Sequence, residues 1–367
     1  MSASLVLPDE CAHTQNQFGE MDVDGDLVAS ASNVAEDVMM LNNGCVCCTV
    51  RGDLVKMVGE LVSDPDEEES EGGGAEAKKK KKRFDHILIE TTGLADPRPI
   101  VQTFFNEATL VDKVHLDGVV CVVDSYFAEK HLDEKGGSHK GDETAVNEAK
   151  EQICYSDRIV INKVDLVEDD AAKLEGLEKR IRDLNPMAEQ KRTCNADVDV
   201  EWALGVGGFN LETVASQLES QLKLEDTHKE NDHDHAHDHD HDHDHEHDDH
   251  HHHHHHHHHD DSVGSVSLVL PGDLDLEKVN LWLETLLMMR SNDIYRTKGV
   301  LALEDWDHRF VFQAVHEMFS GAAEREWGSD EERVSRLVFI GKDLNQEDMM
   351  SSFKECLAQP QNSKEES

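Results

Sequence analysis

Three cysteines lie within four residues, at Cys45, Cys47 and Cys48. Thiolates and imidazoles are the ligands that zinc prefers, in tetrahedral geometry. In an extended segment Cys45 and Cys47 point to one side and Cys48 to the other. The segment can therefore supply two ligands of one site, and the remaining ligands have to come from elsewhere in the fold. Buried small side chains or a redox pair are the alternatives, but a histidine-rich tract further along the chain favours a metal.

A second group with its own chemistry is Asn162-Lys163-Val164-Asp165, which follows a predicted strand. The carboxylate of Asp165 would accept hydrogen bonds from both the ring N–H and the exocyclic amine of guanine, a pair that adenine lacks. Asn162 and Lys163 would brace the base and the neighbouring loops. A bare four-residue match has modest specificity, and an exposed polar loop is the alternative. The position at the end of a strand favours a guanine site.

The segment Glu90-Thr91-Thr92-Gly93 also closes a predicted strand. Glu90 could hold the hydration shell of magnesium, and the N–H of Gly93 could meet a terminal phosphate. Turns of this composition are common, so the segment is weak evidence alone. Because it precedes the guanine motif, as in GTPases, it predicts a catalytic pair.

The run 228–259 alternates histidine with aspartate and then becomes nearly all histidine. Such a tract binds transition metals loosely and at several sites. We interpret 223–262 as a metal-binding linker; a solvated linker without function is the alternative.

Apolar runs rich in β-branched residues would position these groups, and each ends in a polar residue that begins a loop. The runs are 87–89, 119–123 and 159–161, and the polar residues are Glu90, Asp124 and Asn162. Strands that deliver polar groups at their carboxyl ends, with helices between them, predict a parallel α/β sheet with a ligand along that edge. A helix over 142–155 would cross back to the third strand.

After the histidine tract the pattern restarts as a small α/β domain. Apolar residues alternate over 266–270 and then recur at helical spacing over 276–286, with Asp273 as a candidate helix cap. Residues 337–340 predict another strand. Residues 296–299 and Trp306 could form a partner or nucleotide-sensing surface, but composition favours a cap and a core aromatic.

The formal charge of −44 excludes whole classes of partner. Such a chain repels nucleic acid and anionic lipid, and no apolar run approaches the ~20 residues that span a bilayer. Crowded cysteines fit a reducing compartment better than a disulfide framework. We expect an intracellular, cytoplasmic protein; the basic run 78–83, within the charged loop 64–83, leaves a nuclear location open.

In combination these motifs resemble the CobW-like GTPase family, and within it the eukaryotic zinc-regulated GTPase metalloprotein activators. The segment 16–20 (Asn-Gln-Phe-Gly-Glu), the cysteine cluster, 89–97 (IETTGLADP), 122–124 and 162–165 occur in the family's order. The C-terminal 296–299 (RTKG) and 336–341 resemble the CobW C-terminal domain.

The resemblance implies a P-loop GTPase-like, mostly parallel sheet over 1–222 and a small α/β CobW C-terminal domain over 263–358, followed by a polar tail, 359–367. It implies GTP, Mg²⁺ and Zn²⁺ as ligands and a client metalloprotein as partner. The metal site would comprise Cys45, Cys47 and Cys48 with Glu20. Glu90 and Gly93 would be catalytic. Asn162, Lys163 and Asp165 would hold guanine.

Two departures from the family pattern matter. Position 17 is Gln where the family has Glu, so one acidic ligand is gone. The sequence also contains no GxxxxGK[ST], the loop whose N–H groups, lysine and hydroxyl hold phosphates and magnesium. We therefore expect a sheet that lacks its first strand, from a truncated gene model, an isoform or a degenerate paralogue.

The sequence thus predicts a GTP-dependent zinc chaperone that delivers metal to a client and is impaired in GTP hydrolysis. A non-catalytic metal buffer and a client-docking scaffold are the alternatives.

Overall fold

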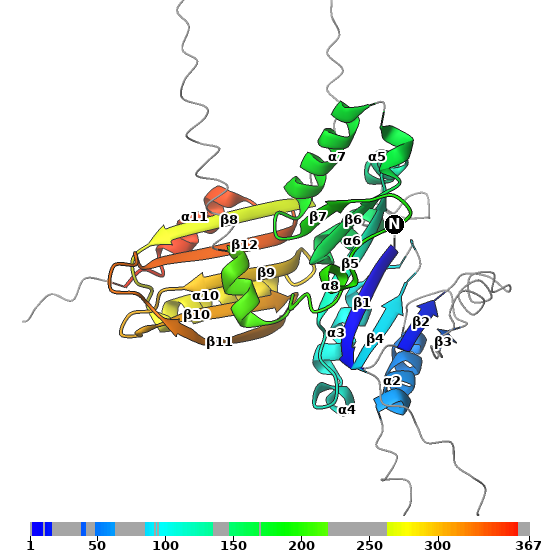
Figure 1. Cartoon of the computed structure of the whole chain (residues 1–367). Coiled ribbons are helices and arrows are strands. Elements are labelled where there is room, and N and C mark those ends of the chain that lie inside the picture. The colour runs from blue at the N-terminus through cyan, green and yellow to red at the C-terminus, as the bar shows by residue number, and fades with distance from the viewer. Residues whose placement is uncertain are drawn as a thin grey trace, which may run out of the picture.

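The protein is built on two β-sheets, each covered by helices (Figure 1). The structure is a computed structural model. It describes residues 2–9, 12–16, 38–41, 48–62, 85–91, 93, 95–134, 147–168, 170–218 and 263–358. The predicted loop 64–83 and histidine linker lie outside the described residues.

The larger sheet has seven strands in the order β3-β2-β4-β1-β5-β6-β7. The strands are β1 (Ser2–Asp9), β2 (Ala12–Asn16), β3 (Val38–Leu41), β4 (Asp85–Glu90), β5 (Gly118–Asp124), β6 (Arg158–Asn162) and β7 (Glu189–Arg192). All pairings that do not involve β1 are parallel, which confirms the predicted mostly parallel sheet. The sheet was expected to lack its first strand, but β1 lies between β4 and β5 at its centre and runs antiparallel to both.

Apolar strand residues lie on both faces of this sheet, and most of the helices pack on one of them. Val119, Cys121 and Val123 of β5 join the main core, whereas Val120 packs on the other face beside Trp202. The helices are α2 (Cys48–Val62), α3 (Arg98–Asn106), α4 (Ala108–Val111), α5 (Ala128–Asp133), α6 (Glu148–Tyr155), α7 (Ala171–Leu184) and α8 (Val200–Ala203), and residues 211–218 are also helical. The predicted helix over 142–155 is observed as α6, which Asn147 caps; 141–146 lie outside the described residues.

The smaller sheet is antiparallel, with the order β11-β10-β9-β12-β8. Its strands are β8 (Val263–Pro271), β9 (Ile294–Leu301), β10 (His308–Val315), β11 (Met318–Glu326) and β12 (Val334–Lys342), and α10 (Leu276–Met289) and α11 (Gln346–Lys354) pack into its core. The predicted cap was wrong. Asp275 accepts a hydrogen bond from the N–H of Lys278, whereas Asp273 pairs with Arg333.

A buried ion cluster joins the two sheets. Arg296 of β9 donates to Asp157 at 2.5 Å, to the carbonyl of Tyr155 and to the carbonyl of Gly208. Lys298 lies 3.4 Å from the same carboxylate. The segment 296–299 is therefore an interdomain clamp rather than a partner surface. Trp306 is 37% exposed, so it is not the core aromatic that composition favoured.

No helix among the described residues is long and apolar enough to cross a membrane. Among the described cysteine side chains, Cys121, Cys154, Cys194 and Cys356 are free thiols.

Candidate functional site

The predicted guanine motif lies where β6 ends. β6 stops at Asn162, Lys163 adopts a left-handed backbone with φ of 62°, and a single 3₁₀ turn, η2 (Val164–Val167), follows. This sharp turn leaves Asp165 exposed beyond the carboxyl end of the strand. Its carboxylate is thus presented to the edge of the sheet where ligands of parallel α/β folds bind.

Lys163 is held in place by an acid from the neighbouring strand. Its ammonium lies 2.7 Å from Oδ2 of Asp124, the last residue of β5. The other carboxylate oxygen accepts from the N–H groups of Tyr126 and Phe127. Partial burial opposes ionisation of Asp124, but these hydrogen bonds outweigh it, so that the pKa of Asp124 lies below its ordinary value.

Asn162 fastens a second loop to the site. Its Oδ1 accepts a hydrogen bond of 2.9 Å from the N–H of Ala196. Asn195 and Ala196 both have positive φ, which turns the loop after β7 back toward β6. The predicted bracing role of Asn162 therefore has a structural counterpart, but the partner loop was not predicted. The sequence gives only weak evidence for this loop, namely an Asn-Ala pair after a polar strand.

Asp124 was predicted only as a strand end, without a role. Its position after the buried run 119–123 places it beside Asn162 once β5 and β6 pair in parallel, since the two are register partners. That pairing, rather than any local motif, identifies Asp124 as part of the site.

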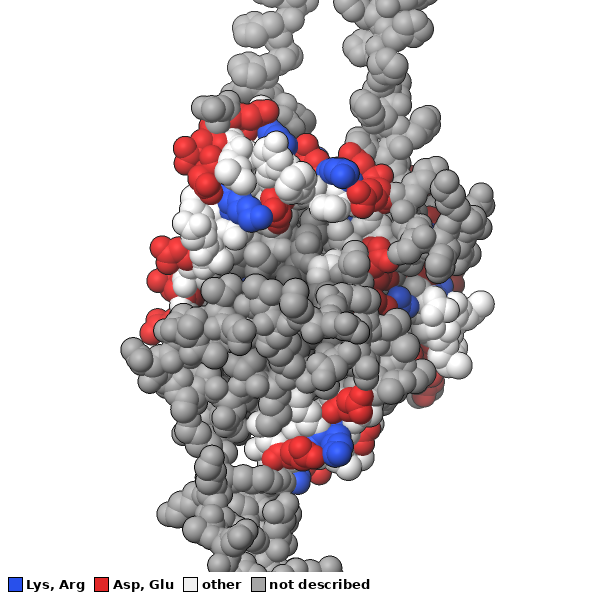
Figure 2. Space-filling view, turned by 90° about the vertical axis from the view of Figure 1, so that its right-hand side faces the viewer, with Lys and Arg blue, Asp and Glu red and all other residues white. Residues whose placement is uncertain are grey.

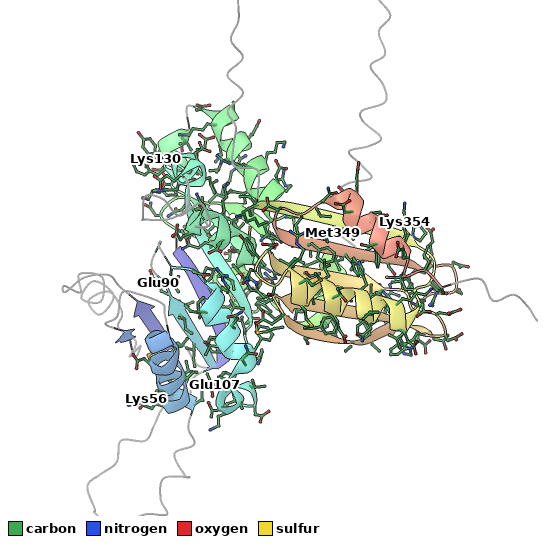
Figure 3. All side chains as sticks on the ribbon, turned by 180° about the vertical axis from the view of Figure 1, so that it is seen from behind. Lys56, Glu90, Glu107, Lys130, Met349 and Lys354 are labelled. Carbon is green, nitrogen blue, oxygen red and sulfur yellow. The ribbon has the colours of Figure 1, made fainter. Side chains whose placement is uncertain are left out.

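Glu90 and Gly93 lie at the same edge of the sheet but apart from the guanine motif. Glu90 ends β4 (Figure 3), and Gly93 is exposed in the turn after it. β1 separates β4 from β5, which places their axes about 10 Å apart. Ser4 is the register partner of both Glu90 and Val120, so β5 continues four residues beyond the level of Glu90 to Asp124.

The proposed metal ligands fall at the margin of what the structure describes. Glu20, Cys45 and Cys47 lie outside the described residues, and for Cys48 the backbone alone is described, as the first residue of α2. β3 is parallel to β2 and β4 and ends at Leu41. The chain therefore leaves β3 at the edge that also carries Glu90. Within the described ranges, no group of three or more His, Cys, Asp or Glu side chains could hold a metal ion.

The described residues do not fit the expected magnesium site. Magnesium in nucleotide sites takes one or two protein oxygens together with phosphate oxygens and water. In P-loop GTPases the ion is shared by an acid and the Ser or Thr hydroxyl of GxxxxGK[ST], and this sequence has Glu90 but not that loop, whose backbone and lysine would also hold the phosphate oxygens that complete the shell. We therefore assign no step to magnesium.

A cavity of about 430 Å³ opens elsewhere, between α3 and the smaller sheet. Arg98 and Gln102 line it from α3, and His316 and Glu317 line it from the turn after β10. None of the predicted site residues reaches it, so the candidate site is the open edge of the large sheet.

Comparisons with known proteins agree with this arrangement. Residues 9–192 match the family described as CobW/HypB/UreG, nucleotide-binding domain, and 263–357 match the cobalamin synthesis protein cobW C-terminal domain. The chain is 27% identical to the zinc chaperone YjiA of Escherichia coli, over 92% of this chain and 87% of that protein. It is 28% identical to the zinc chaperone CobW of a Sinorhizobium species, over 89% and 83%.

Over 53% of its length the chain is also 27% identical to the zinc-regulated GTPase metalloprotein activator 1 of Saccharomyces cerevisiae, of which it covers 43%. The crystal structure of the Zn(II)-bound YjiA GTPase from E. coli has the same fold, with a TM-score of 0.62 and 22% identity. That likeness covers 95% of this chain and 91% of the other.

Proposed function

Because the chain belongs to the CobW/HypB/UreG family, we propose that it is a guanine-nucleotide-dependent zinc chaperone that delivers zinc to a client metalloprotein. The relatives named as zinc chaperones and metalloprotein activators support this role. Zinc is the cargo, carried by Cys45, Cys47 and Cys48 with Glu20. Thiolate ligands of this kind require a reducing compartment, so the protein would act inside the cell.

The observation that carries the proposal is the common edge of the large sheet. β6 delivers Asn162, Lys163 and Asp165 there, and β3 ends at the same edge before α2 begins at Cys48. In parallel α/β folds the ligand lies along the carboxyl ends of the strands. β3 lies five strand spacings, about 24 Å, from β6, so a guanine ligand and zinc at this edge would influence each other through the strands and loops between them.

The same residues support weak turnover at most. Hydrolysis of GTP needs groups that hold the β- and γ-phosphates and the attacking water. Glu90 and Gly93 would act here, but the sequence lacks the GxxxxGK[ST] loop that would place the phosphates beside them. We therefore propose that this chain is impaired in GTP hydrolysis.

Zinc binding tests the cargo site. The purified chain would be titrated with zinc against a chelating dye, beside a Cys45→Ser, Cys47→Ser, Cys48→Ser variant and a variant with 228–259 replaced by Gly-Ser repeats. We expect the tightest zinc to be lost in the first variant and kept in the second. A Cys194→Ser variant, which removes a thiol outside the cluster, is the control. Tight zinc that depends on the histidine tract alone would identify a metal buffer instead.

Transfer of zinc tests the nucleotide dependence. Release from the loaded chain to the chelator would be timed with guanine nucleotide, with adenine nucleotide and without either. We expect only guanine nucleotide to change the rate, and Asp165→Ala to remove that effect. Release that ignores guanine nucleotide would contradict the chaperone proposal and favour the buffer.

A further inference from the structure

The central strand of the large sheet runs against the strands on both sides of it. β1 is antiparallel to β4 and to β5, while every other described pairing in this sheet is parallel. In Figure 1 the arrow of β1 points away from the edge at which β4 ends. The family match begins at residue 9, so this strand precedes the matched segment.

The direction of β1 decides whether the loop that follows this strand lies at the base-binding edge of the sheet. In open parallel sheets, phosphates are held by the loop that follows a central strand and by the N-terminus of the next helix. That loop requires a strand whose carboxyl end lies at the ligand edge. β1 brings its amino end there, since Ser2 pairs with Val122 near the end of β5, while Asp9 pairs with Asp85 at the start of β4. Between β4 and β5 the described chain therefore offers no phosphate-binding loop.

The charges at this edge also give phosphates no attraction. Glu90, Asp124 and Asp165 are acidic residues at or just beyond strand ends. Of the described lysines here, Lys163 is paired with Asp124. The ammonium of Lys173 lies over the ring of Tyr126, 5.3 Å from its centroid. Acidic side chains also predominate over basic ones among the described residues in Figure 2. Salt screens the repulsion between these solvent-accessible carboxylates and a nucleotide's phosphates, and both lysines are engaged, so an added phosphate changes the affinity little.

We propose that this edge reads the guanine base and is indifferent to the number of phosphates attached to it. The inference rests on the guanine site of the proposed function and extends it: guanosine, GMP, GDP and GTP are alike as ligands. The specificity resides in Asp165, with the lysine and the loop around Ala196 as its supports.

Calorimetric titration of the purified 367-residue chain with guanosine, GMP, GDP and GTP tests this directly, in EDTA and again in magnesium. We expect dissociation constants within about threefold of one another, because even one charged hydrogen bond to a phosphate would add about tenfold. Adenosine should not bind, and Asp165→Ala, which changes an exposed side chain, should abolish binding of all four.

Two failures are distinguishable in that series. Binding of GDP or GTP about tenfold tighter than guanosine, in either buffer, would overturn the inference and leave the guanine site in place. Failure of guanosine and all three nucleotides to bind would instead remove the guanine site, and the inference with it.

A disulfide tests the direction of β1 independently of ligand binding. The register places Ala3 opposite Cys121 and Leu5 opposite Val119. Ala3→Cys should form a bond to Cys121 under diamide, mapped by peptide mass spectrometry, and Leu5→Cys should not. Burial raises the pKa of the Cys121 thiol to about 12, so the reaction should be slow and faster at alkaline pH. A bond from Leu5→Cys, or from neither variant, would overturn the antiparallel register.

Discussion

At the scale of single residues, the candidate site depends on side chains that hold loops rather than on side chains that touch a ligand. Asn162 accepts from the N–H of Ala196, and Asp124 holds Lys163. Both acceptors sit at strand ends, where a short polar side chain can reach a neighbouring loop. The site is therefore shaped by hydrogen bonds that a substitution can remove one at a time.

Asn162→Ala is expected to weaken guanosine binding about tenfold while costing about 1 kcal/mol of stability, because it leaves the Ala196 N–H without its acceptor. Calorimetry and urea unfolding measure the two effects. Asn280→Ala, which removes an exposed contact with Glu284 on α10, is the matched control and should change neither. Unaltered guanosine affinity in Asn162→Ala would show that the loop does not shape the site.

Lys298 should make stability depend on pH. Burial, and next the charge of Arg296, lower its pKa from 10.5 to about 7, and Asp157 offsets this only in part. Between about pH 7 and 10.5 the unfolded chain keeps this proton and the folded chain does not, so stability rises with pH through that window. The slope is at most about 1.4 kcal/mol per pH unit.

Lys298→Met should remove that slope. Urea unfolding of both proteins at pH 6 to 9 isolates the contribution of Lys298, because every other group titrates in both. A wild-type stability that falls with pH relative to the variant would contradict the low pKa of Lys298.

At the scale of elements, the sequence predicted the strands and helices that are encoded by a local pattern of apolar residues. Buried β-branched runs gave β4, β5 and β6 with the correct polar end residues, and alternation gave β8. The direction of β1 was not predictable, since alternation reads the same in both directions and only the neighbouring strands decide it. The helix cap was placed two residues early, because Asp273 and Asp275 are equally good caps by type.

Substituting Asp273 and Asp275 one at a time distinguishes the cap of α10 from the ion-pair residue. Asp275→Ala should cost about 1 kcal/mol, because it removes the acceptor for the N–H of Lys278 at the start of α10. Asp273→Ala should leave the helix intact, since it loses only a half-exposed pair with Arg333. Helical circular dichroism and urea unfolding measure this. A larger loss of helix in Asp273→Ala would restore Asp273 as the cap.

At the scale of the whole molecule, one face of the smaller sheet shares a core with the larger sheet. Tyr155 of α6 stacks on Tyr295 of β9, and both belong to a cluster that includes residues of each sheet. The Arg296–Asp157 pair lies within this contact, with both side chains almost fully buried. Nothing in the sequence links these two residues, which are 139 positions apart, and buried charges look like surface charges until the partner is known.

Arg296→Ala is expected to cost about 3 to 5 kcal/mol, because it removes the closest charge partner of the buried Asp157 carboxylate and leaves only Lys298, 3.4 Å away, and the N–H of Val119. Scanning calorimetry should show one transition in the wild type and two in the variant, as the sheets lose their shared unfolding. Arg325→Ala, which breaks an exposed pair with Glu331, should cost less than about 1 kcal/mol. A single, little-shifted transition in Arg296→Ala would contradict the clamp.

The clamp also gives β6 a mechanical character. Asp157 directly precedes β6, and Asn162 is its last residue. One strand of five residues, about 17 Å long, therefore has the Arg296–Asp157 ion pair at one end and the predicted guanine motif at the other. A hydrogen-bonded strand between two parallel neighbours barely stretches. A force applied to the smaller sheet is therefore transmitted along β6. It either breaks the Arg296–Asp157 ion pair or displaces the turn that follows Asn162.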